Sequence, residues 1–346
     1  MEETREKKYS KKKGLKKSTY LLIVIDILVV ICFFLAYGPI GYFRNLFVNT
    51  ALKTMTHKYF AYVLYSEDTV TDIKNSNYFV RISDTTNTDD IVIDTKEKDA
   101  YDNEYDKAIL TREKGNEEYK LLNIKVGSAD GYLVAIYDPS KVRLIAKEQL
   151  GTKYGERIIT MCERYKGTVC INGGGFVDKG YGSGIPNGYV VKDGKIIWSD
   201  GYNPKAELIG FTNDNKLLLT TDSAENAIKN KNLRDALQFG PFLIVNGKPL
   251  EIVGDPWGKA PRVAIAQRKD GVVLFLVVDG QNYVFGASLK DMIETLQKYG
   301  AYNAANLDGG TSATLVVNNK LVNKPSGGAA STNGRYVITG WGLLNG

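Results

Sequence analysis

Two aspartates, each preceded by an apolar run and followed by glycine, are the residues of this chain best placed to do chemistry. Asp279 follows the run Leu274–Val278, and Asp308 lies in the segment Asn306–Ser312. Two carboxyl groups facing one pocket suit hydrolysis of a glycosidic bond, because one can protonate the leaving oxygen while the other assists attack. They could instead hold a divalent cation such as Ca²⁺ or Mg²⁺ through hard oxygen ligands. Each Asp-Gly pair taken alone is typical of a plain turn.

Two further clusters could hold an anion such as a phosphate. Arg262 opens the apolar run Arg262–Ala266, and its planar guanidinium matches a phosphate or carboxylate, although a surface salt bridge is the common fate of a single arginine. The segment Asn172–Phe176 places three consecutive glycines after a short strand. Such glycines permit positive φ and leave backbone amides bare for an anion, and a plain turn explains the segment equally well.

Other common catalytic and metal-binding motifs are absent from the sequence. It contains no Walker A, H-E-x-x-H or G-x-S-x-G motif and no cysteine spacing typical of zinc sites. The only histidine, His57, lies in a membrane-proximal segment, so a Ser-His-Asp triad is not expected. Cys162 and Cys170 could pair, but we expect two separate small buried residues.

Short strands and a few helices are the elements expected to position these residues. The 35 glycines indicate many tight turns, and turn signals such as Asp193-Gly194 and Asn246-Gly247 recur between apolar runs. Helices are expected over residues 155–166 and 288–299, with Ser288 as the N-cap of the second. The pattern predicts an α+β fold with mixed or antiparallel sheets and a few flanking helices.

The N-terminal region is typical of a single-pass membrane anchor. Residues 20–40 are apolar except for Asp26, and their number is close to the ~20 residues that span a bilayer. The basic tail of residues 1–19 predicts a cytoplasmic N-terminus and an extracytoplasmic body at the cell membrane. A cleaved signal peptide is the competing interpretation, but the apolar run is long for one.

Residues 41–118 are predicted to connect this anchor to the body. Aromatic and apolar residues recur at helical spacing over residues 42–65, which indicates an amphipathic helix lying on the membrane or on the body. Residues 66–118 are polar and poorly periodic, apart from a short strand-like run at 91–93. We therefore expect a polar stalk or linker over this second part.

Most of the formal net charge of +6 belongs to the N-terminal tail. Residues 1–17 hold eight of the 45 basic groups and three of the 39 acidic groups, which leaves 37 basic and 36 acidic groups elsewhere. The body is therefore close to neutral and lacks the electrostatic footprint of a nucleic-acid-binding protein. We expect no nucleic-acid partner.

Seven pieces of the sequence, in order, are similar to the phosphodiester glycosidase family, whose bacterial members are often labelled exopolysaccharide biosynthesis proteins. Together they cover roughly residues 119–346, the expected glycosidase domain. The sequence departs from the family pattern at Gln281, Thr311 and Ala266, which bears on substrate detail more than on reaction class. The matching pieces are Ile171–Phe176, Gly240-Pro241 with Val245–Gly247, Arg262–Ala266, Val277–Gln281, Ser288-Leu289, Asn306–Ser312, and Asn323–Ser326 with Arg335–Val337.

The resemblance implies a hydrolase that cleaves a sugar-1-phosphate diester between the anomeric carbon and the phosphate oxygen. Asp308, Asp279 and Arg262 are the expected catalytic residues, with the division of roles between the aspartates left open. The sequence requires no cofactor, and a divalent cation remains an open alternative. The expected substrate-binding residues are Asn172, Gly173, Gly174, Gln238, Asn306, Gly309, Gly310, Thr311 and Ser312.

The expected partners are the membrane, through the N-terminal helix, and a cell-surface glycan or sugar-phosphate polymer. Two other functions compete with this expectation. One is a non-catalytic glycan-binding protein of exopolysaccharide assembly, which would not need its aspartates in one pocket. The other is a metal-dependent phosphodiesterase, which would lose activity in chelator.

Overall fold

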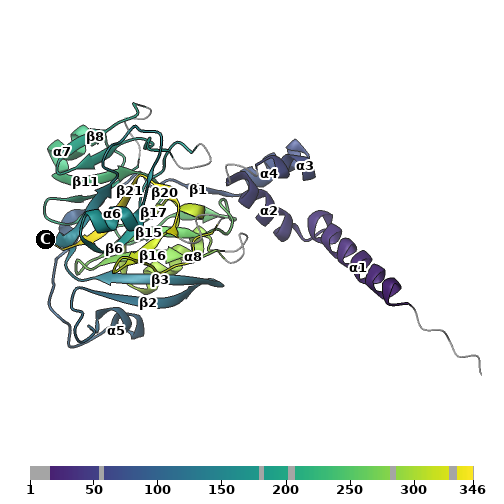
Figure 1. Cartoon of the computed structure of the whole chain (residues 1–346), viewed down its shortest axis with the longest axis horizontal. Helices are drawn as coiled ribbons and strands as arrows, with labels where there is room; N and C mark the ends of the chain where they lie inside the picture. Colours follow the sequence, from purple (N-terminus) through teal and green to yellow (C-terminus); the bar gives the residue numbers. More distant parts are fainter. Residues whose placement is uncertain are drawn as a thin grey trace, which may run out of the picture.

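The computed structural model describes residues 16–53, 58–178, 183–201, 207–280, 286–326 and 333–345. Most of the basic tail, together with His57 and Gln281, lies outside the described residues. Figure 1 shows a β-rich body with the N-terminal helices projecting from it.

A seven-stranded antiparallel sheet carries both aspartates at the ends of two of its inner strands. Every residue of β15 (Arg262–Arg268) and β16 (Val273–Val278) is buried, as in strands covered on both faces. In order across the sheet, the strands are β13 (Lys248–Pro249), β12 (Phe242–Val245), β17 (Ala301–Leu307), β15, β16, β3 (Ala129–Ile136) and β2 (Tyr119–Val126).

Two five-stranded sheets share one hydrophobic core with a face of this sheet. Trp341 and Phe211, one from each smaller sheet, meet edge to face in that core with ring centroids 5.4 Å apart. The first smaller sheet contains, in order, β19 (Lys320–Leu321), β18 (Leu315–Val317), β6 (Gly167–Asn172), β21 (Thr339–Leu344) and β4 (Val142–Ala146). The second contains β10 (Leu217–Thr220), β9 (Leu208–Thr212), β11 (Leu233–Gln238), β7 (Val190–Lys192) and β8 (Lys195–Trp198).

Helices cover the outer faces of the sheets. Helix α8 (Leu289–Lys298) and helix α5 (Glu104–Leu110) add apolar residues to the core on the far face of the seven-stranded sheet. Helix α6 (Ile158–Arg164) and helix α7 (Ala224–Lys231) pack on the two smaller sheets. The α+β prediction is confirmed, and every strand pairing among the described residues is antiparallel.

Helix α8 begins where the sequence predicts. Ser288 and Asp291 form a capping box, in which the Asp291 amide donates to Ser288 Oγ and the Ser288 amide donates to Asp291 Oδ2. These reciprocal bonds satisfy amides that the first helical turn leaves without partners. The helix stands beside β17, the strand that ends at Asp308.

Helix α1 (Lys17–Tyr37) is long and apolar enough to cross a membrane, and none of its residues is buried. In Figure 1 it projects away from the body. A signal sequence near the N-terminus would also satisfy these criteria of length and composition. The structure therefore establishes an exposed apolar helix at this end of the chain.

The single amphipathic helix expected over residues 42–65 is two helices, α2 (Gly41–Lys53) and α3 (Lys58–Leu64). A third helix, α4 (Glu67–Asn75), follows in the region expected to be a stalk. The three helices enclose their own small cluster of buried residues, including Val48, Ala61 and Val70, which explains the apolar spacing. They lie between α1 and the body (Figure 1).

The remainder of the predicted stalk lies against the body. Strand β1 (Tyr78–Val80) pairs with β14 (Glu251–Val253), and the Val92 amide donates to the carbonyl of Lys269. Thr86 is buried, and its hydroxyl accepts a 2.8 Å bond from the Leu219 amide. The polar-stalk interpretation of residues 66–118 is thus corrected, because long-range backbone pairing orders a segment that has little periodicity of its own. The domain boundary at residue 119 stays a prediction.

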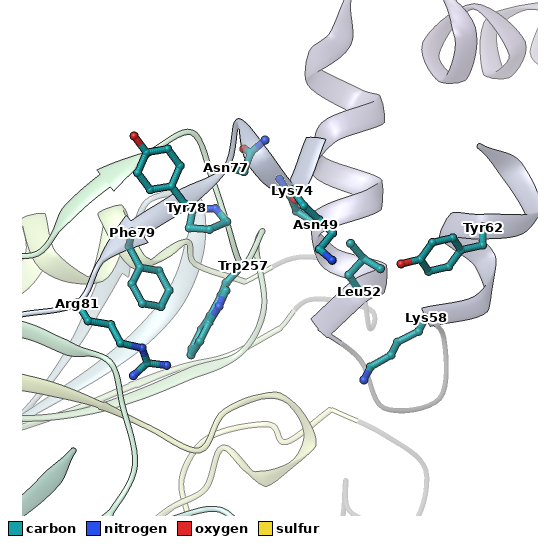
Figure 2. Close-up of a pocket in the computed structure, with 11 residues that line it drawn as sticks. Asn49, Leu52, Lys58, Tyr62, Lys74, Asn77, Tyr78, Phe79, Arg81 and Trp257 are labelled. Carbon is teal, nitrogen blue, oxygen red and sulfur yellow. The ribbon is translucent and has the colours of Figure 1, made fainter. Parts of the chain in front are cut away.

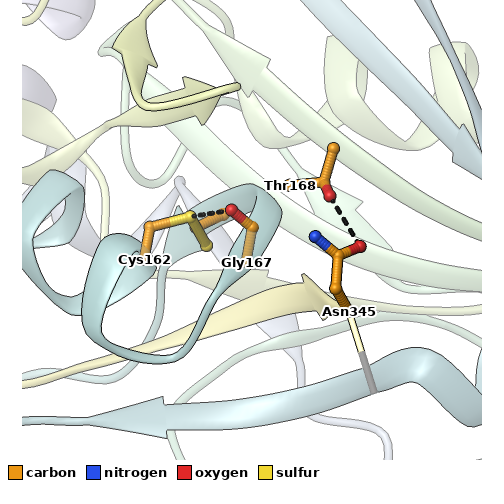
Figure 3. The surroundings of a disulfide bond; sticks show 5 residues. Cys162, Gly167, Thr168 and Asn345 are labelled. Carbon is orange, nitrogen blue, oxygen red and sulfur yellow. Dashed lines mark hydrogen bonds between the residues drawn. A yellow bond between two sulfur atoms is a disulfide. The ribbon is translucent and has the colours of Figure 1, made fainter.

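Cys162 on α6 and Cys170 on β6 form a disulfide (Figure 3), so the expectation of two separate buried residues was wrong. A Cβ on Gly167 would lie 2.7 Å from Cys170 Sγ and 2.9 Å from Cys162 Sγ, so this turn requires glycine. Near it, the Thr168 hydroxyl donates to Asn345 Oδ1 and fastens the C-terminal end of the chain. The disulfide therefore joins α6 to the strand that leads into the Asn172–Phe176 segment.

Replacing both bridged cysteines, Cys162→Ala with Cys170→Ala, should lower the free energy of unfolding by about 2 to 3 kcal/mol, the usual effect of opening a short disulfide loop. Chemical denaturation of the full chain in neutral detergent measures this. Cys32→Ala, at the free cysteine of α1, is the matched control and should leave the stability within error. Equal stability of the double variant and the wild type, with and without reductant, would contradict the prediction.

Candidate active site

The strand register brings Asp279, Arg262 and Asp308 together at one end of the strands of the seven-stranded sheet. β15 lies between β16 and β17, with Arg262 opposite Val278 and Val263 opposite Leu307. Asp279 and Asp308 therefore leave the sheet on either side of the start of β15. Two strand spacings separate their backbones by about 10 Å.

Asp308 lies where the end of β17, in the seven-stranded sheet, meets the end of β6, in the first five-stranded sheet. Its amide donates to the carbonyl of Gly173 (2.9 Å), and its own carbonyl accepts from Asn172 Nδ2 (2.6 Å). Asn172 is fully buried, and its Oδ1 accepts from the Thr314 amide (3.0 Å). The Asn172 side chain thus spans the two ends of the loop that carries Asp308 and positions it, and its predicted role in substrate binding stays a prediction.

The glycines at 173 and 174 serve packing, so the hypothesis of bare amides that cradle an anion is corrected. The Gly173 amide donates to the Thr339 carbonyl (2.9 Å), and the Gly174 amide donates to Thr339 Oγ1 (3.0 Å). Neither residue has positive φ. A Cβ on Gly173 would lie 2.6 Å from a methyl carbon of Leu237, so the close approach of the two smaller sheets excludes a side chain there.

Burial raises the pKa of the Asp308 carboxyl to about 6. A hydrogen bond from Ser312, the positive charge of Arg335 and the Gly309 amide act in the opposite direction, while the negative charge of Asp178 raises this pKa further. A carboxyl with a pKa near 6 is present in both protonation states near neutral pH, as general acid–base catalysis requires.

Arg335 and Asp178 complete the surroundings of Asp308. Arg335 Nη2 lies 2.5 Å from Asp178 Oδ2, and Nη1 donates to Thr311 Oγ1 (3.1 Å). Its guanidinium stands 5.0 Å from the ring centroid of Phe176. Sequence reasoning did not select these two charged residues, although Asp178 follows the glycine segment closely and Arg335 belongs to one of the matching pieces.

The loop after Asp308 is folded tightly onto the start of β15. The Gly310 amide donates to the Pro261 carbonyl (2.9 Å), and a Cβ on Gly309 would lie 2.5 Å from that same oxygen. Gly310 has a φ of +60°, which favours glycine. Ser312 is buried beside Asp308, while Thr311 is exposed at the open side of the loop.

Asp279 differs from Asp308 in how fully its oxygens are occupied. Its carboxylate accepts from Asn323 Nδ2 (2.9 Å), from the Lys324 amide (3.0 Å) and from the Tyr132 hydroxyl. Burial raises its pKa, and these three hydrogen bonds oppose the rise. Asn323 also accepts from the Leu315 amide (2.7 Å). Asp279 thereby anchors the segment that follows β19 beneath the Asp308 loop.

Arg262 is enclosed and bound to backbone. Its Nε donates to the Ala287 carbonyl (3.1 Å), and its Nη2 donates to the carbonyls of Trp257 (3.0 Å) and Gly258 (2.9 Å). Desolvation lowers its pKa to about 10, which the negative charge of Asp255 partly offsets. These hydrogen bonds fix the backbone at Trp257 and Gly258. The positive charge that acts on Asp308 belongs to Arg335.

Gln238 and Asn306 also bind backbone. Gln238 Oε1 accepts from the Tyr189 amide (3.2 Å), and Asn306 Nδ2 donates to the Gly240 carbonyl (3.1 Å). Asn306 is buried, and its Oδ1 is without a hydrogen-bond partner among the described residues. Both side chains therefore shape the segment around Gly240, and their predicted role in substrate binding stays a prediction.

No group of three or more His, Cys, Asp or Glu side chains gathers into a metal-binding cluster within the described parts of the chain. The carboxylates of Asp308 and Asp178 influence each other electrostatically and share the site with the positively charged Arg335. The divalent-cation hypothesis stays a prediction for experiment.

Comparison with known proteins identifies a family model and several relatives. A family model described as phosphodiester glycosidase matches residues 165–344. A prophage-derived protein of Bacillus subtilis is 30% identical over 203 residues, covering 56% of this chain and 31% of that protein. The bovine and human N-acetylglucosamine-1-phosphodiester alpha-N-acetylglucosaminidases are 45% and 43% identical over 65 residues, covering 19% of this chain and 12% and 13% of theirs. The chain thus spans about a third or less of the length of these relatives.

The fold is also that of a solved relative. The zebrafish N-acetylglucosamine-1-phosphodiester alpha-N-acetylglucosaminidase catalytic domain, auto-inhibited by its pro-peptide, superposes with a TM-score of 0.56 at 22% identity. The match covers 66% of this chain and 83% of that one. Since the family model spans just over half of the chain, including Asp178, Asp279, Asp308 and Arg335, this protein belongs to the phosphodiester glycosidase family.

Proposed function

We propose that this chain is an extracytoplasmic hydrolase that cleaves a sugar-1-phosphate diester between the anomeric carbon and the phosphate oxygen. The observation that carries the proposal is the carboxyl of Asp308, whose pKa is raised to about 6 beside Arg335. The named relatives act on N-acetylglucosamine-1-phosphodiesters, which suggests the class of substrate for this chain.

The chemistry divides between an anion-binding side and a carboxyl side. Arg335 is positioned to pair with the phosphate charge, because a guanidinium offers parallel N–H donors to phosphate oxygens. In the reaction the bond from the anomeric carbon to the phosphate oxygen breaks, the oxygen of water bonds to that carbon, and its proton is released. Phosphate is a good leaving group, so less acid assistance is needed than for an ordinary glycoside.

Asp178 takes the place of Asp279 as the second carboxyl group in this proposal. The oxygens of Asp279 are occupied by Asn323, Lys324 and Tyr132, whereas Asp178 lies beside Arg335 and close enough to raise the pKa of Asp308. Kinetic measurements on variants of Asp308 and Asp178 would assign the roles of acid, base and nucleophile within this pair.

The proposed location is the outer face of the cell membrane, with α1 as a single-pass anchor. The apolar helix and the preceding basic residues support this topology. The disulfide between Cys162 and Cys170 supports it independently, because such bonds persist mainly in oxidising compartments. The proposed substrate is a cell-surface glycan or sugar-phosphate polymer.

Asp308→Asn should lower kcat for sugar release from N-acetylglucosamine 1-phosphate methyl diester by about 10² to 10⁴, the usual contribution of an acid–base group. Asp84→Asn removes the same charge from an exposed position and should keep full activity. Repeating the wild-type assay in chelator tests the divalent-cation hypothesis. No sugar release by the wild type, or full activity of Asp308→Asn, would contradict the proposal.

The pH dependence of kcat/KM should show an inflection near pH 6 that belongs to Asp308. Removing the neighbouring positive charge with Arg335→Gln should move this inflection to higher pH, since the ionised carboxylate loses its partner. Removing the neighbouring negative charge with Asp178→Asn should move it to lower pH. Shifts in the same direction for both variants would rule out this electrostatic assignment.

The raised pKa of Asp308 also predicts a pH-dependent stability difference. Because the folded pKa is about 6 and the unfolded one 3.8, ionised Asp308 destabilises the fold as pH rises through this window. Relative to the wild type, Asp308→Asn should therefore gain on the order of 2 to 3 kcal/mol between pH 4 and pH 7. Calorimetry at several pH values measures this, and parallel stability curves for the two proteins would contradict it.

A further inference from the structure

A pocket of about 480 Å³ lies where the helices α2 to α4 meet the body. Asn49 on α2, Lys58 and Tyr62 on α3, and Lys74 on α4 line it from the helical side. Phe79 on β1 and Trp257 line it from the body. Figure 2 shows Lys58 and Tyr62 extending toward the side where Phe79 and Trp257 lie.

The charged residues among those described as lining the pocket are all cationic. They include Lys58, Lys74 and Arg81 and no acidic residue. Arg81 pairs with Glu207, whereas the two lysines form no ion pair among the described residues. Two ammonium groups from different helices at one pocket form a site for an anion.

Asn49 supplies an independent sign of a ligand. Only 3% of this residue is exposed, and its Nδ2 has no hydrogen-bond partner among the described residues. A buried donor without an acceptor is unfavourable, and an acceptor supplied by a ligand would satisfy it.

Aromatic rings give the pocket a second chemical character. Phe79 and Trp257 meet edge to face with ring centroids 5.5 Å apart, and Tyr62 stands across from them. Aromatic side chains combine apolar faces with polar edges, and such faces suit the C–H faces of a sugar ring. Cations, a buried amide and aromatic rings together match a sugar that carries a phosphate.

The same short stretch of chain links this pocket to the Asp308 loop. Arg262 binds the carbonyls of Trp257 and Gly258 at the pocket wall, and the adjacent Pro261 carbonyl accepts from Gly310. Residues 257–262 therefore contribute to the pocket wall at one end and bind the Asp308 loop at the other.

We propose that this pocket is an accessory subsite that binds a phosphate-bearing sugar unit of a polymeric substrate, away from the bond that is cleaved. The inference rests on the proposed function for the class of substrate. Lys58 and Lys74 pair with the phosphate, the Asn49 amide donates to a sugar or phosphate oxygen, and Trp257 and Phe79 contact the ring.

The test measures binding with the full chain carrying Asp308→Asn, in phosphatidylcholine nanodiscs, so that it does not depend on turnover. The probes are N-acetylglucosamine 1-phosphate methyl diester and a phosphodiester-linked trimer of N-acetylglucosamine 1-phosphate. Adding Lys58→Gln with Lys74→Gln should reduce the preference for the trimer over the monomer at least about tenfold, the equivalent of one charge-assisted hydrogen bond. The salt dependence of trimer binding should fall as well.

Lys229→Gln with Lys298→Gln is the matched control, because both lysines lie exposed on α7 and α8, outside the pocket. An unchanged trimer preference in the pocket variant, or an equal loss in the control, would overturn the subsite. Nanodiscs containing phosphatidylglycerol distinguish a lipid headgroup: if this lipid abolishes the lysine-dependent part of trimer binding, the pocket belongs to the membrane and the proposal fails. Absence of wild-type turnover with intact trimer binding would refute the proposed function and leave the subsite standing.

Discussion

The candidate site depends on two hydrogen bonds that join the end of β6 to the end of β17. The Asp308 amide binds the Gly173 carbonyl, and Asn172 Nδ2 binds the Asp308 carbonyl. Strands from two different sheets are thereby fixed at Asp308, whose carboxyl pKa is raised to about 6. Because both bonds use backbone atoms of Asp308, its side chain is left to face Ser312 and Arg335.

Residues of the same type have different environments at this end of the seven-stranded sheet. Asp279 is buried and Asp308 is half-buried, each directly after a strand. Three donors contact the carboxylate of Asp279, whereas Ser312 and the Gly309 amide are the hydrogen-bond partners of the Asp308 carboxyl. Likewise, the Arg262 guanidinium donates its hydrogen bonds to backbone carbonyls. The Arg335 guanidinium instead forms an ion pair with Asp178 and donates a hydrogen bond to Thr311. One member of each pair binds groups of the scaffold, and the other lies at the proposed catalytic site.

Local signals made much of the fold predictable from the sequence. The capping box of α8 and the strands before Asp279 and Asp308 depend on neighbouring residues, so spacing alone reveals them. The Cys162–Cys170 bridge, the pairing of β1 with β14 and the contact of Arg335 with Asp178 depend on three-dimensional packing. Single-sequence reasoning could nominate Arg262 by type, but only the structure shows that carbonyl groups surround it.

The central claim is that the bond to the anomeric carbon breaks, rather than a bond to phosphorus. Hydrolysis of a sugar-1-phosphate diester in water labelled with oxygen-18 tests it directly. The phosphate product is the sensitive readout, because the anomeric hydroxyl of a free sugar exchanges with water. We expect mass spectrometry to find no label in the phosphate monoester that is released, and incorporation of label into that phosphate would show that the protein is a phosphodiesterase instead.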